Sequence, residues 1–176
     1  MKLNLDKYDS EFLNIISDLL ENSEVKKMDE FRQHYNTTCL DHCINVAYYN
    51  YLICKKLKLD YVSAARAGLL HDLFLYDWRK KQPGRKRLHA FYHPRAALNN
   101  SKALFNLNKK EEDIILKHMW PVTVILPKYK ESYITTLTDK FSTLAETHKY
   151  YCDKLESKRA YRYAYIFLSL LVIPII

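Results

Sequence analysis

Scarcity of glycine is the sequence feature that most restricts the fold of this chain. Only two glycines and five prolines occur in 176 residues. A protein built from many short strands needs more of both residue types at its tight turns. Apolar residues instead recur at helical spacing, as in Phe12, Ile15, Ile16, Leu19 and Leu20. The sequence therefore predicts an all-α fold, a helical bundle long enough to bury one hydrophobic core.

We expect a single domain over residues 1–176, because no repeat, low-complexity tract or linker divides it. Residues 1–33 would form N-terminal helices, residues 34–150 the core of the domain, and residues 155–176 an apolar closing helix. The apolar stretch Tyr163–Ile176 has fourteen residues, fewer than the roughly 20 that cross a bilayer. Burial against the domain is therefore favoured over membrane contact, which stays the alternative for this tail.

Polar residues that start or stop helices divide the core of the domain. Thr37 or Thr38, Asp60 and Asn108 precede apolar periodic segments and are suitable N-caps. Pro94 suggests that a helix starts at His93, since proline is favoured at the first helical position. The expected core helices cover about residues 39–57, 61–74, 93–105, 109–118 and 131–152. A short helix is also expected within residues 24–33, and an irregular loop within residues 77–92.

Basic residues outnumber acidic ones, with a formal net charge of +8. Such an excess favours phosphate-bearing partners, namely nucleotides, nucleic acid or an anionic membrane surface. Six of the nine residues from Arg79 to Arg87 are cationic. This basic loop is either a phosphate-binding segment or a solvated charged surface.

The four cysteines indicate reduced thiols in a cytoplasmic protein. They form no CxxC pair, and no signal peptide precedes them. A zinc site at Cys39, His42 and Cys43 lacks a second pair of ligands, so small buried thiols are the favoured interpretation.

Six histidine and aspartate residues are distributed over the five expected core helices or their ends. The set comprises His42, His71, Asp72, His93, His118 and Asp139. Adjacent residues on a regular helix point about 100° apart, so His71 and Asp72 can share an ion most easily where their helix ends. Imidazole and carboxylate ligands suit Fe, Mn, Zn or Ni better than Mg or Ca alone. The pattern predicts a site for one or two divalent transition metal ions.

The order of these residues resembles the HD-domain superfamily of metal-dependent phosphohydrolases. The resemblance rests on His42 in His42-Cys43-Ile44-Asn45-Val46-Ala47, on the doublet in Ala67-Gly68-Leu69-Leu70-His71-Asp72, and on Asp139 late in a helix. It covers roughly residues 34–150. His93 and His118 resemble the branch with two metals. The resemblance implies a bundle of the HD-domain type in which Asp72 is the catalytic residue, bridging two ions beside a nucleophilic hydroxide.

The expected activity is hydrolysis of a phosphate ester or anhydride in a small phosphorylated substrate, with a nucleotide as the expected class. Fe or Mn is the expected metal, with Zn, Ni and Mg as alternatives.

Cations stabilise charge on a transferring phosphoryl group. Candidate substrate-binding residues are Arg85, Lys86, Arg87, Lys140, His34 and His89. His89 also competes with His93 as a ligand, since both flank Phe91-Tyr92; His93 is preferred.

Two other functions are compatible with the sequence. Some two-iron relatives of this superfamily are oxygenases, and the ligand pattern alone does not exclude that chemistry. A non-catalytic basic helical module would instead bind nucleic acid or an anionic membrane through residues 79–87 and the apolar tail, with strong salt dependence. We expect no stable nucleic-acid complex if the chain is a hydrolase. The sequence predicts neither the substrate nor the oligomeric state.

Overall fold

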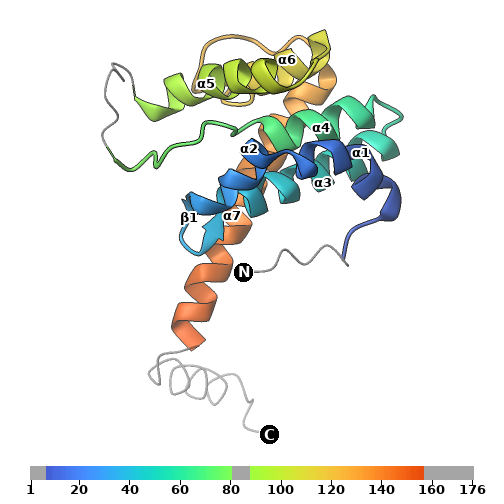
Figure 1. Ribbon diagram of the computed structural model, residues 1–176. Helices are drawn as coiled ribbons and strands as arrows, with labels where there is room; N and C mark the ends of the chain where they lie inside the picture. Colours follow the sequence, from blue (N-terminus) through green and yellow to red (C-terminus); the bar gives the residue numbers. More distant parts are fainter. Residues whose placement is uncertain (1–6, 81–87, 157–176) are drawn as a thin grey trace, which may run out of the picture.

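The computed structural model describes residues 7–80 and 88–156, which form an all-α fold with one two-stranded sheet (Figure 1). This confirms the all-α prediction. The elements are α1 (Ser10–Glu21), α2 (Ser23–Lys26), a 3-10 helix η1 (Lys27–Glu30), β1 (Arg32–His34), β2 (Thr37–Thr38), α3 (Cys39–Lys56), α4 (Tyr61–Leu70), α5 (His89–Leu104), α6 (Lys109–Lys117) and α7 (Lys130–Glu156). The closing helix expected from residue 155 falls almost entirely outside the described residues. In the described part of the chain, no helix has both the length and the hydropathy of a membrane span.

Helices α3 and α4 form the most extensive contact in the molecule, and α7 packs against both. The small residues of α4 allow this close packing, as the sequence predicts. A methyl group on Gly68 would lie only 2.7 Å from Asn50 Nδ2 and 2.8 Å from Ala47 Cα. The Asn50 side chain donates to Ala64 O and to Thr135 Oγ1, at 3.0 and 2.9 Å, which ties the three helices together. Gly68 is therefore required by the approach of α3.

Helices α5 and α6 lie side by side at one end of the molecule, and α7 runs from that end past α3 and α4 (Figure 1). The core formed by α1, α3, α4 and α6 is apolar, with Phe12, Ile44, Leu69 and Ile114 all fully or almost fully buried. A polar cluster lies where α3, α4, α5, α6 and α7 meet.

The N-caps that the sequence predicts are confirmed. Thr38 Oγ1 accepts from Asp41 N at 3.1 Å, and Asp60 accepts from Ser63 N at 3.0 Å. Asn108 accepts from Glu111 N at 2.9 Å, while the Glu111 side chain accepts from Asn108 N at 2.8 Å. These reciprocal bonds form a capping box that sets the start of α6.

Helix α4 ends at Leu70, four residues before the predicted end. His71 and Asp72 therefore follow the helix in a turn, in which Phe74 N donates to Asp72 O at 2.8 Å. His71 keeps α-helical dihedral angles as the C-cap of α4, and its Nε2 lies 3.6 Å from Oδ2 of Asp72, the next residue.

The prediction of a short helix within residues 24–33 holds for residues 24–30 and is wrong for the last three. Only α2 and η1 are helical there, and Arg32–His34 instead pairs as an antiparallel strand with Thr37–Thr38. The reversal needs a left-handed residue, which Tyr35 supplies with φ of 48°. A bond from Cys39 N to Phe31 O, at 2.7 Å, closes the hairpin. Gln33 and His34 are thereby held beside the polar cluster.

The predicted helix start at His93 is also wrong. Helix α5 begins at His89, so Pro94 lies inside it. The extra turn is stabilised by Phe91 N, which donates to Leu88 O at 3.0 Å, and by the His89 ring, which stacks on His93 with centroids 4.5 Å apart. These contacts form the turn although no side chain caps it.

Candidate metal centre

Six side chains from five helices converge in the polar cluster. His42 comes from α3, His93 from α5 and Asp139 from α7, while His71, Asp72 and His118 directly follow the ends of α4 and α6. The four histidines and Asp72 are each at most 4 % exposed. This set is the complete group of metal ligands predicted from the sequence. Their polar atoms approach closely enough to hold a metal ion.

The first half of the cluster surrounds Asp139. Its Oδ1 lies 3.2 Å from His42 Nε2 and 3.8 Å from His71 Nε2. His71 Nε2 also lies 3.6 Å from Asp72 Oδ2. The donor atoms of His42, His71 and Asp72 are close enough to one another to hold an ion, and so are those of His71, His118 and Asp139.

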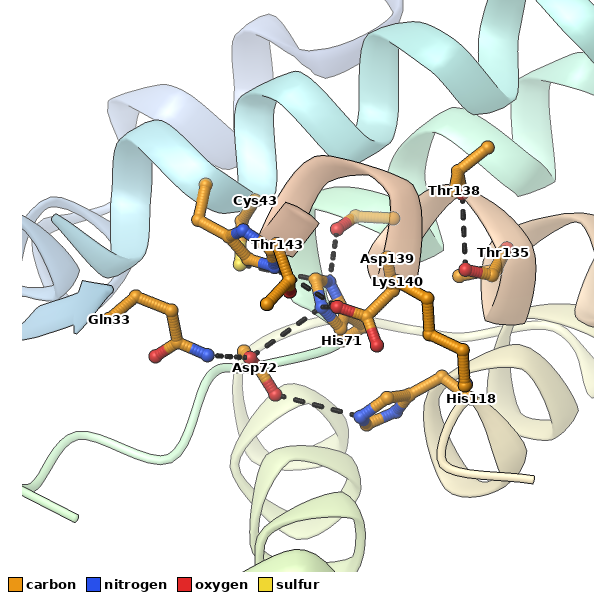
Figure 2. A network of polar contacts seen from close by, with 12 residues as sticks. Gln33, Cys43, His71, Asp72, His118, Thr135, Thr138, Asp139, Lys140 and Thr143 are labelled. Atoms are coloured by element: carbon orange, nitrogen blue, oxygen red, sulfur yellow. Dashed lines mark hydrogen bonds and ion pairs between the residues drawn. The ribbon is translucent and has the colours of Figure 1, made fainter. Parts of the chain in front are cut away.

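The second half surrounds the other oxygen of Asp72. Oδ1 lies 3.2 Å from His93 Nε2 and 3.7 Å from His118 Nε2, and these two nitrogens are 2.8 Å apart. Figure 2 shows Asp72 between Gln33 on one side and His118 on the other. Asp72 is therefore the residue shared by both halves of the cluster.

Three of the histidine rings have the tautomer that a metal ligand needs. The Nδ1 atoms of His71, His93 and His118 lie 2.7, 3.0 and 2.9 Å from the backbone oxygens of Gly68, His89 and Ile115. A carbonyl oxygen only accepts, so each Nδ1 carries the proton. In the neutral ring, Nε2 then presents a lone pair to the cluster.

The Nε2 lone pairs and the carboxylate oxygens of the cluster are all electron-rich and repel one another. A positive charge between them, from a proton or a metal ion, removes this repulsion. His71 Nε2 and Asp72 Oδ1 are buried, and neither has a hydrogen bond among the described residues. Ligands about 2.1 Å from one ion lie about 3 Å apart, close to the spacings of 2.8 to 3.8 Å found here. The donor set and its spacing could therefore hold a metal ion.

The pKa values of the clustered side chains are shifted by the charges around them. Burial alone would raise the pKa of Asp72, but His71, His93 and His118 outweigh it and lower that pKa to about 2. Burial would lower the pKa of His42, yet its hydrogen bonds to Asp139 and Glu146 raise it well above the ordinary value. Burial, with His71 and His93, lowers the pKa of His118 to about 3. Burial would raise the pKa of Asp139, but His42 and His71 lower it well below the ordinary value. Asp72 and Asp139 are thus ionised near pH 7, and His118 is neutral.

Two residues of the site were not predicted from the sequence. Gln33 Nε2 donates to Asp72 Oδ2, while its Oε1 is buried without a hydrogen bond among the described residues. Glu146 accepts from His42 Nδ1, with both carboxylate oxygens at 3.1 Å. Glu146 follows Asp139 by seven residues, a spacing that places both on one face of α7. That spacing is the only sequence signal that pointed to Glu146, and Gln33 had none.

A cavity of about 520 Å³ opens onto the cluster. Its lining includes the predicted substrate-binding residues His34, His89 and Lys140, together with Gln33, Asp72, Trp78, Ala90, His93, His118, Met119, Asp139, Thr143 and Leu144. Arg85, Lys86 and Arg87 lie outside the described residues. Lys140 Nζ donates to Trp120 O at 3.1 Å and to Thr136 O at 3.2 Å, and burial lowers its pKa.

His89 and His93 have different places in the site. His93 is one of the clustered donors, whereas His89 is not part of any donor group formed by the described residues. The His89 ring lies between His93 and Trp78, with centroid distances of 4.5 and 5.4 Å, and Tyr76 Oη contacts its Nδ1 at 3.2 Å. His89 therefore supports His93 and forms part of the cavity wall.

Comparison with known proteins gives no relative for this chain. No family model matches it, and neither a curated protein nor a solved structure does so.

Proposed function

We propose that this chain is a metal-dependent phosphohydrolase of the HD-domain type that acts on a small phosphorylated substrate. The observation that carries the proposal is the cluster itself: three Nε2 lone pairs and two ionised carboxylates, buried together at the floor of a cavity. Bound divalent ions would supply a hydroxide near neutral pH and polarise a phosphoryl oxygen. Of the expected metals, Fe and Mn suit this nitrogen and oxygen donor set.

The chain's own residues would orient and neutralise the substrate. Asp72 and Asp139 would hold the ions at the cavity floor, with one Asp72 oxygen directed to each half of the cluster. Lys140 follows Asp139 on α7 and lines the cavity, so its ammonium group can approach a phosphoryl oxygen by leaving its carbonyl partners. Gln33 Oε1 can accept a hydrogen bond from a water molecule beside Asp72.

The cavity supports a small substrate. Its volume of about 520 Å³ lies in the range of 300 to about 1,000 Å³ that is usual for small-molecule sites. Its lining combines the apolar side chains of Trp78, Met119 and Leu144 with the charged groups of the cluster. A nucleotide has a matching division between a charged phosphate and a flat, less polar base, so it is the substrate class that we propose.

Phosphate release by metal-reconstituted protein tests this function. Metal-stripped protein supplied with Mn²⁺ or anaerobic Fe²⁺ is expected to release phosphate from at least one nucleotide or small phosphate ester. Asp72→Asn, which is nearly isosteric, should abolish release while keeping the helical circular dichroism of the wild type. His148→Ala is the matched control, because His148 is exposed on α7 and should leave release unchanged.

Failure of this test would take two forms. Oxygen consumption by the iron-loaded protein without phosphate release would place the same centre in the two-iron oxygenase class. Salt-dependent binding of polyanions that survives Asp72→Asn, with no reaction for any metal tested, would favour the non-catalytic basic module.

A further inference from the structure

The Nδ1 atom of His42 has a partner unlike those of the other three clustered histidines. In His71, His93 and His118 this atom faces a neutral backbone carbonyl. In His42 it faces the carboxylate of Glu146, with both oxygens at 3.1 Å. One histidine of the four is therefore oriented by a charged side chain.

The hydrogen bond with His42 is the main polar contact of the Glu146 carboxylate. The side chain of Glu146 is only 10 % exposed, and the Asn45 side-chain amide also donates to it, at 3.5 Å. Among the described residues, no lysine or arginine forms an ion pair with it. A buried carboxylate is costly unless it is paired, so the imidazole of His42 is the group that stabilises Glu146 in this position.

His42 thus lies between the carboxylates of Asp139 and Glu146, which are two turns apart on α7. Asp139 Oδ1 lies 3.2 Å from Nε2, on the side of the cluster, and Glu146 lies behind the ring at Nδ1. If a metal ion takes Nε2, the proton on Nδ1 stays hydrogen-bonded to Glu146. A carboxylate in this place fixes the ring orientation and makes the other nitrogen a stronger electron donor.

We propose that Glu146 is the positioning residue of the metal centre, which holds His42 with Nε2 directed at the ion and strengthens it as a ligand. The inference rests on the proposed metal site, and it does not depend on which reaction that site performs. Glu146 acts through His42 and need not touch substrate.

Binding of Co²⁺ to metal-stripped protein, followed by its visible absorption, tests the proposal without any substrate. Glu146→Ala is expected to weaken Co²⁺ binding about 10- to 100-fold, the usual effect of losing such a partner. Glu146→Gln should recover part of the loss, since its amide oxygen can still accept from Nδ1. Asp153→Ala is the control: it removes an exposed carboxylate from the same helix and should leave the affinity unchanged.

Three results would overturn the proposal. The first is wild-type Co²⁺ affinity in a folded Glu146→Ala protein. The second is a Glu146→Gln protein that binds as weakly as Glu146→Ala. The third concerns His34, which with His42 and Glu146 forms another possible donor group: loss of one bound ion in both His34→Ala and Glu146→Ala would make Glu146 a direct ligand instead.

The outcome is separable from that of the phosphohydrolase proposal. Normal Co²⁺ binding by Glu146→Ala refutes the role of Glu146 and leaves hydrolysis possible. Absence of phosphate release by a wild-type protein that binds Co²⁺ refutes hydrolysis and leaves the role of Glu146 intact.

Discussion

Single residues decide how closely the helices around the site can approach. Gly68 lies two residues beyond Arg66 and three before His71, on the part of α4 that faces α3. Helix α3 carries His42, and α4 leads into His71 and Asp72. The separation of the two helices therefore sets the distance from His42 to the other two ligands. The requirement for glycine at residue 68 is therefore also a requirement of the site.

Gly68→Ala is expected to destabilise the protein although alanine is the better helix former. The new methyl group would overlap the Asn50 amide and the Ala47 backbone. Overpacking of this kind costs about 1 to 3 kcal/mol, and over most of this range the cost exceeds the roughly 1 kcal/mol gained in helix propensity. Denaturant unfolding measures the difference. Equal or higher stability of the variant would show that α3 and α4 are less tightly packed than described.

At the scale of elements, α6 is joined to α7 by a buried carboxylate. Asp113 accepts from Lys128 N at 2.9 Å and from Ser132 Oγ at 2.7 Å, and it also pairs with Lys117. Burial raises the pKa of Asp113, but these partners outweigh it, so the pKa lies below the ordinary 3.8. These bonds hold the start of α7, and hence Asp139, against the helix that leads to His118.

The lowered pKa of Asp113 predicts a pH dependence of stability. A folded-state pKa below the unfolded one gives stabilisation that is present above about pH 4 and is lost as the pH falls through the folded value. Asp113→Asn should therefore unfold at lower denaturant concentration than the wild type at pH 6, and the difference should shrink toward pH 3. A constant difference over this range would mean that ionisation of Asp113 contributes nothing.

Local signals explain which elements could be predicted. Thr38, Asp60 and Asn108 each cap a helix with a side chain close in sequence, so the starts of α3, α4 and α6 follow from the residues alone. The start of α5 has no such signal, because Leu88 offers no capping side chain and two histidines four residues apart, such as the stacked His89 and His93, do not mark a helix start. The hairpin is too short for an alternating pattern, and it depends on the left-handed Tyr35.

At the scale of the whole molecule, the six predicted ligands meet although they span nearly a hundred residues. Their meeting could be anticipated because each lies on, or at the end of, a different helix, and such helices pack around one core. Glu146 and Gln33 could not be selected in the same way, since glutamate and glutamine are common on helical and extended surfaces. Their roles depend on the path of α7 and on the hairpin, both of which are set by tertiary contacts.

The most direct test of the account is the number of transition metal ions that the protein binds. Metal-stripped protein, dialysed against Mn²⁺ or anaerobic Fe²⁺ and analysed for metal, should retain one or two ions per chain. Asp72→Asn should retain fewer, because Asp72 contributes an oxygen to each half of the cluster. Wild-type protein that retains no metal, or an Asp72→Asn protein that retains as much as the wild type, would contradict the account.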